Sequence, residues 1–137
     1  MKRVISLLIA VVIFLTPISA NATGVNSEPT LLKAKATAYI LKGTTASGEE
    51  TREGICAAKK EWLGCTIIMY QRLPDDTVGM FIGAYEVKDT GGTKGIKSGK
   101  VIDVWRPSLD DAQAFMDAVY LDGCKGNVYI QVLQADG

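Results

Sequence analysis

Short runs of apolar and β-branched residues, separated by glycines and polar turns, make up most of the chain after residue 32. Runs of this kind are typical of β-strands. The strands that the pattern predicts are residues 36–40, 55–58, 66–70, 80–87, 101–105 and 128–133. Gly83 lies inside the fourth run, where a glycine indicates a bulge or the close approach of another group.

One segment has the apolar spacing of a helix instead. Ser108 can cap its N-terminus, and Asp110 and Asp111 suit the positive end of the helix dipole. Its apolar positions follow the i, i+3, i+4, i+7 pattern: Ala112, Phe115, Met116 and Val119. We expect this helix to end before Gly123. Six short strands, one helix and no extended βαβ pattern predict a mainly β fold, a small barrel with a helical connection.

The amino-terminal segment has the pattern of a secretory signal peptide. Two basic residues are followed by an apolar run over residues 4–15 and by Ala-Asn-Ala at 20–22. A retained membrane anchor is the alternative, but this run is short for the roughly 20 residues that cross a bilayer. We therefore expect cleavage after Ala22, or else after Ala20, and an extracytoplasmic protein with no stable membrane anchor.

The length of 137 residues fits one domain after this leader. The expected divisions are 1–22 as signal peptide, 23–32 as a short linker and 33–137 as the barrel domain. Loss of Lys2 and Arg3 with the leader leaves two fewer basic than acidic residues, which argues against nucleic acid as a partner. The chain has no histidine, which excludes histidine-based catalytic triads and histidine-ligated metals. We expect no cofactor.

The three cysteines are expected to be structural. An exported chain could pair two of them, and Cys56 and Cys65 could lie on neighbouring strands, but the spacing leaves the pairing with Cys124 open. A zinc site would lack a fourth ligand, and a cysteine nucleophile would lack a histidine base. Buried or bridged thiols are the better interpretation, and we expect no metal site.

Two aspartates stand where acid–base chemistry is plausible. Asp103 lies in a strand between Ile102 and Val104, where desolvation would raise its pKa and suit a general acid for glycosidic cleavage. Asp89 ends an apolar strand and precedes Gly91 and Gly92. The alternatives are an Asx-type turn at Asp89 and a solvent-facing Asp103. A phosphate loop at 91–95 is disfavoured, because the GxxxxGK[ST] spacing is absent.

These motifs resemble the 3D (three-aspartate) domain family of bacterial exported proteins. The resemblance extends from about Lys33 to Leu133. It rests on KATAY (35–39), ASG (46–48), REGICAAKKEWLGCTI (52–67), KDTGG (88–92), KVIDVW (100–105) and NVYIQVL (127–133). It implies a six-stranded double-psi β-barrel with one or two short helices. Rare lipoprotein A-like proteins, expansin domains and the membrane-bound lytic transglycosylase A group share that fold.

The resemblance also implies an activity. In the catalytic members, an aspartate in the position of Asp103 protonates the glycosidic oxygen of a peptidoglycan strand. It then acts as a base toward the sugar's own 6-hydroxyl, and a 1,6-anhydro end results. Asp89 would be the supporting catalytic aspartate. The same motifs, together with the KG pair (94–95) that follows KDTGG, supply the expected substrate-binding residues: Thr37, Tyr39, Gly91, Gly92 and Lys94.

This chain departs from the family at one carboxylate. The third aspartate of the family follows the second strand, where residues 57–60 here are Ala-Ala-Lys-Lys. A non-catalytic module that binds cell-wall glycan is therefore one alternative function. An inverting glycoside hydrolase is another, and it would need two carboxyl groups roughly 6.5–9.5 Å apart with a water between them.

Overall fold

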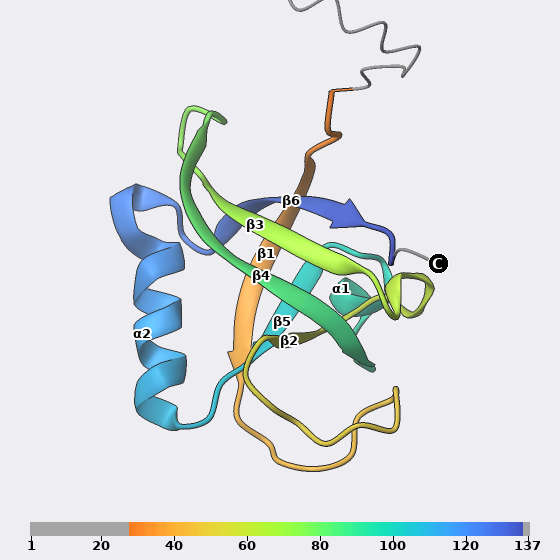
Figure 1. Ribbon diagram of the computed structural model, residues 1–137. Helices are drawn as coiled ribbons and strands as arrows, with labels where there is room; N and C mark the ends of the chain where they lie inside the picture. Colours follow the sequence, from red (N-terminus) through yellow and green to blue (C-terminus); the bar gives the residue numbers. More distant parts are fainter. Residues whose placement is uncertain (1–27, 136–137) are drawn as a thin grey trace, which may run out of the picture.

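Six strands form a closed barrel in the computed structural model, which describes residues 28–135. The strands are β1 (Leu32–Tyr39), β2 (Ile55–Ala58), β3 (Thr66–Arg72), β4 (Val78–Thr90), β5 (Val101–Trp105) and β6 (Asn127–Leu133). Their order around the barrel is β1-β5-β2-β4-β3-β6 (Figure 1). β1 pairs with β5, and β2 with β4, in parallel, whereas the other four pairings are antiparallel. This mixed barrel confirms the predicted mainly β fold class and is compatible with a double-psi barrel.

The helical segments are short. They are α1 (Lys94–Lys97), α2 (Leu109–Tyr120) and two 3-10 turns, η1 (Lys60–Trp62) and η2 (Leu121–Gly123). The expected cap of α2 is confirmed, because Ser108 Oγ accepts a hydrogen bond from the Asp111 backbone N–H at 3.1 Å. The sequence pattern missed α1, which lies in the glycine-rich segment after β4.

The predicted strands are confirmed, but four of them, β1, β3, β4 and β6, extend beyond the predicted bounds, β1 and β4 the furthest. β1 begins four residues early, at Leu32, because the alternation of lysine with alanine at 33–36 continues the period of the strand. β4 reaches from Val78 to Thr90 and includes a bulge at Ile82, since Met69 pairs with Gly83 and Tyr70 with Phe81. A Cβ on Gly83 would lie 2.5 Å from the hydroxyl of Tyr85, so this glycine permits both the bulge and the close approach.

Alternate residues of the strands fill the inside of the barrel, and α2 lies along one side of it (Figure 1). Phe115 and Val119 of α2 belong to the same buried cluster. The ring of Phe115 meets that of Tyr85 edge-on, with 6.2 Å between centroids. Apolar side chains thus fill the barrel interior, and polar side chains that could do chemistry lie on the outer face.

The amino-terminal segment and the three cysteines were the subject of further expectations. The predicted signal peptide and the first residues of the linker lie outside the described residues. Within residues 28–135 no helix has the length and apolar character needed to cross a membrane. Cys56, Cys65 and Cys124 are all buried and none is disulfide-bonded, so of the two expected states, buried or bridged, the structure shows the buried one.

Candidate active site

Four residues lie in register across four neighbouring strands of the barrel. Thr37 of β1 pairs with Asp103 of β5, Asp103 pairs with Ala57 of β2, and Ala57 pairs with Asp89 of β4. We call these four residues the aspartate row. Neighbouring strands are about 4.8 Å apart, so the two aspartate backbones are separated by about 10 Å. Only the methyl group of Ala57 stands between them in the row.

Asp89 reaches this row because β4 contains a second bulge. Val87 is fully buried in the core and pairs with Cys56, whereas the next β2 residue, Ala57, pairs with Asp89. Lys88 is therefore an extra residue in β4. In a regular strand Asp89 would face the same side as Val87, the barrel interior. The bulge turns the carboxylate to the outer face, beside Ala57.

Ion pairs hold the inserted Lys88. Its Nζ lies 3.4 Å from Glu49 Oε1 and 3.5 Å from Glu86 Oε2. Glu49 belongs to the loop of residues 40–54, which connects β1 to β2 and extends from the lower end of the barrel in Figure 1. The bulge and the loop are thereby fastened to each other.

Asp103 is partly buried and has one oxygen without a protein donor. Thr37 Oγ1 donates to its Oδ1 at 2.8 Å, and no residue among 28–135 donates to Oδ2. Burial raises the pKa of Asp103, the hydrogen bond from Thr37 lowers it, and the charge of Asp89 raises it again. Burial is the largest effect and the pKa is raised overall. The sequence predicted this direction from the apolar neighbours of Asp103.

Asp89 has a different environment, with donors on both oxygens. Its Oδ1 accepts from the backbone N–H groups of Ala46, at 3.0 Å, and Thr90, at 2.9 Å. Its Oδ2 accepts from the Tyr39 hydroxyl at 3.5 Å. The Asx-type turn left open as an alternative at Asp89 is not formed, because these bonds involve Thr90 and Ala46 of the 40–54 loop rather than Gly91.

Tyr39 and Cys56 border the row but remain protonated. Burial and the charges of Asp89 and Asp103 raise the pKa of the Tyr39 phenol far above its usual value. Burial and the charge of Asp103 raise the pKa of the Cys56 thiol to about 12. A thiol that remains neutral at pH 7 is a poor nucleophile. Tyr39 can act as a hydrogen-bond donor, and Cys56 as part of the apolar layer beneath Asp103.

The other predicted binding residues lie further away. Gly91 packs against the side chain of Ile96 so closely that an added Cβ would collide with it. Gly91 also borders a pocket of about 280 Å³ beyond the ends of β2 and β4, lined by Ala58, Lys59, Lys60, Glu61, Thr90, Gly91 and Lys97. Gly92 and Lys94 are exposed, and within the described residues no hydrogen bond joins either to an aspartate.

Lys59 occupies the position directly after β2 where the family resemblance places the third aspartate. The Nζ of Lys59 lies 4.7 Å from the centre of the Trp62 ring, a cation–π contact. No cluster of three or more metal-ligating side chains occurs in the part of the chain that the structure describes. The position of the third carboxylate in the resemblance is thus taken by a lysine whose ammonium group packs on Trp62.

Sequence reasoning missed two residues that shape the site. Ala57 was noted only as part of a segment lacking an aspartate, although it separates the two carboxylates. The backbone N–H of Ala46 binds Asp89 across 43 residues of sequence. The ASG motif at 46–48 was the available signal, but it did not reveal its partner.

No protein-family model matches the chain, and a search of the curated proteins finds no match. Geometry therefore defines the class of protein: a mixed six-stranded barrel whose outer face carries one partly desolvated and one firmly held aspartate.

Proposed function

We propose that this chain is a 3D-family domain that acts as a lytic transglycosylase on peptidoglycan glycan strands. The observation that carries the proposal is the state of Asp103. Its pKa is raised, Thr37 orients one oxygen, and the second oxygen has no donor among the described residues. A carboxyl group of this kind can hold a proton and deliver it to a leaving oxygen.

The reaction needs one carboxyl group in two roles. Protonated Asp103 gives its proton to the glycosidic oxygen as the bond from that oxygen to C1 of the muramic acid breaks. The resulting carboxylate takes the proton of the sugar's 6-hydroxyl as that oxygen bonds to C1. The products are a new hydroxyl end and a 1,6-anhydro end, no water is consumed, and Asp103 is again protonated.

The environment of Asp89 favours this route over hydrolysis. A hydrolase of the inverting type needs a second carboxylate to activate water. Asp89 already accepts two backbone N–H bonds and faces the Tyr39 hydroxyl. These contacts suit a residue that shapes the groove and raises the pKa of Asp103 through its charge.

A glycan-binding module without activity is the second candidate. It is favoured by Lys59, which stands where the family resemblance places a carboxylate. The same barrel face would then hold a glycan strand without cutting it, and the two aspartates would serve as hydrogen-bond acceptors for sugar hydroxyls.

Incubation of the protein with purified peptidoglycan, followed by mass spectrometry of the soluble fragments, tests the proposal. We expect fragments with 1,6-anhydro ends, their loss in Asp103→Asn, and their retention in Asp110→Asn, which changes an exposed aspartate of α2. Reducing ends, about 18 Da heavier, would instead indicate the hydrolase. Binding to wall material without soluble fragments would indicate the module.

A further inference from the structure

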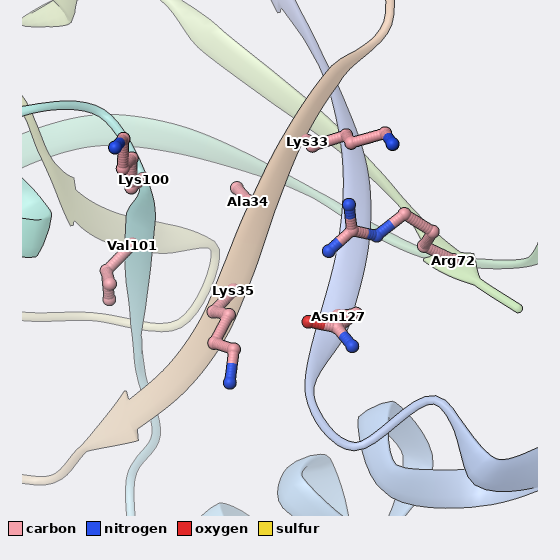
Figure 2. Close-up of a pocket in the computed structure, with 7 residues that line it drawn as sticks. All are labelled: Lys33, Ala34, Lys35, Arg72, Lys100, Val101 and Asn127. Atoms are coloured by element: carbon pink, nitrogen blue, oxygen red, sulfur yellow. The ribbon is translucent and has the colours of Figure 1, made fainter. Parts of the chain in front are cut away.

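A second candidate site lies on the barrel, separate from the aspartate row. It is a pocket of about 370 Å³ where β1, β3, β5 and β6 come together (Figure 2). Its lining residues are Lys33, Ala34, Lys35, Arg72, Lys100, Val101 and Asn127. We call it the basic pocket, because four of these residues are cationic and none is acidic.

Most of this positive charge has no partner within residues 28–135. Lys33 is 3.5 Å from Asp76 and so is partly compensated. Lys35, Arg72 and Lys100 form no ion pair with any described residue. Uncompensated cations around one concavity attract an anion and concentrate it there.

The pocket also has donors with defined directions. In Figure 2, Arg72 and Asn127 lie on one side of β1, and Lys100 and Val101 lie on the other. The Arg72 guanidinium lies 5.8 Å from the ring centre of Tyr129, which helps to hold it. A guanidinium fork and a carboxamide are suited to the planar oxygens of a carboxylate.

Register places this pocket next to Asp103. Lys35 pairs with both Asn127 and Val101, so these three residues form a row parallel to the aspartate row. Thr37 lies two residues after Lys35 on β1, and Asp103 lies two residues after Val101 on β5. Burial alternates along this part of β1, so both rows face outward. The step between them is about 6.6 Å.

We propose that the basic pocket binds carboxylates of the peptide stem on the glycan strand that Asp103 cuts. This identity of the ligand rests on the proposed function. The muramic acid at the cleavage point carries its peptide on a lactyl ether, a side branch that points away from the glycan chain. A branch from the sugar at Asp103 needs to cover one row of side chains to reach Lys35, and the width of two further strands, β6 and β3, to reach Arg72. The protein then prefers strands that retain their peptides.

The test measures binding rather than cutting. Asp103→Asn protein is mixed with insoluble peptidoglycan that carries its peptides, and separately with strands stripped by an amidase. Lys35→Gln with Lys100→Gln should weaken binding to the peptide-bearing material about tenfold, the size of one lost charge-assisted hydrogen bond, and leave binding to stripped strands unchanged. Lys42→Gln with Lys125→Gln removes two exposed charges outside the pocket and should change neither.

The outcomes separate this inference from the proposed function. If the pocket variants bind peptide-bearing strands as tightly as the Asp103→Asn parent does, the inference is overturned. An equal loss of affinity for stripped strands would also overturn it. The peptide-dependent difference, together with no anhydro products from the protein that retains Asp103, would retain the pocket and overturn the transglycosylase. Displacement by inorganic phosphate at lower concentrations than by free stem peptide would overturn the assignment to carboxylates. Circular dichroism of each variant checks the fold.

Discussion

The two aspartates of the row differ in what surrounds them, although only Ala57 separates them. Asp103 lies in the middle of a short strand, with one side-chain donor and a raised pKa. Asp89 lies at a bulge near the end of a long strand, with two backbone donors and the hydroxyl of Tyr39. Burial with a single donor favours the protonated form of Asp103, whereas the donors around Asp89 fix the position of its carboxylate.

This difference indicates a division of work between the two carboxyl groups. A residue that exchanges a proton must be able to exist in both states without loss of structure. A residue that fastens a loop must keep its acceptor oxygens in place. Asp103 meets the first condition and Asp89 the second, and the following predictions test that division.

The largest effect is expected from Asp103→Asn. Asparagine can still accept the hydrogen bond from Thr37, but it has no proton to donate to the leaving oxygen. Release of anhydro fragments should fall at least about 100-fold with an unchanged circular dichroism spectrum. Wild-type turnover in a folded Asp103→Asn protein would remove Asp103 from the proposed role.

Asp89→Ala should mainly lower stability. It leaves the N–H groups of Ala46 and Thr90 without their acceptor, and hydrogen bonds to charged groups contribute about 1.5–3 kcal/mol each when buried. Because the site is only partly buried, we expect the free energy of unfolding in urea to fall by about 1–3 kcal/mol. Asp89→Asn keeps one acceptor oxygen and should lose less. Equal stability of the three proteins would show that Asp89 does not anchor the loop.

The pH profile should shift in opposite directions in two variants. Activity requires protonated Asp103 and should decline as the pH rises through its pKa. Thr37→Val removes a hydrogen bond that lowers this pKa, so the decline should move to higher pH, and Thr37→Ser should restore it. Asp89→Asn removes a charge that raises the pKa, so the decline should move to lower pH. Shifts of the same sign in both variants would contradict the assigned causes.

The smallest effect concerns stability and pH. The pKa of Asp103 is higher in the folded than in the unfolded chain, so folding is favoured at low pH and loses stability as the pH rises through the folded value. Asparagine does not ionise, so the Asp103→Asn protein does not lose this stability as the pH rises. The stability of Asp103→Asn relative to wild type, expressed as the difference in the free energy of unfolding, should therefore be greater at pH 7 than at pH 3, as urea titrations at both pH values would measure. No change between the two would argue against a desolvated Asp103.

Local sequence patterns predicted much of this fold and part of the site. The apolar runs located β2 and β5 at the observed bounds, and the alternation around Asp103 predicted its desolvation. The bulge at Lys88 was not predictable, because it arises from the pairing of β4 with a strand some thirty residues earlier in the chain. Without that register, the orientation of Asp89 and its partners stays undetermined.

The basic pocket illustrates the same limit. Lys33 and Lys35 alternate with alanines, which is a visible strand signal, but they were placed before the first predicted strand. Their companions Lys100 and Arg72 come from β-strand ends far away in sequence. These cations come together only when the barrel closes, so no single segment of the sequence predicts the basic pocket.

The strand order determines the stage of folding at which the aspartate row forms. Thr37 and Asp103 are 66 residues apart, and β1 and β5 are joined only through a parallel pairing that needs a long crossover. Contacts of such high sequence separation form slowly, because chain closure precedes any gain in packing. β6, at the carboxyl end, joins β1 to β3 and completes the ring. The proposed wall-cutting activity would thus stay silent until the ring of strands has closed.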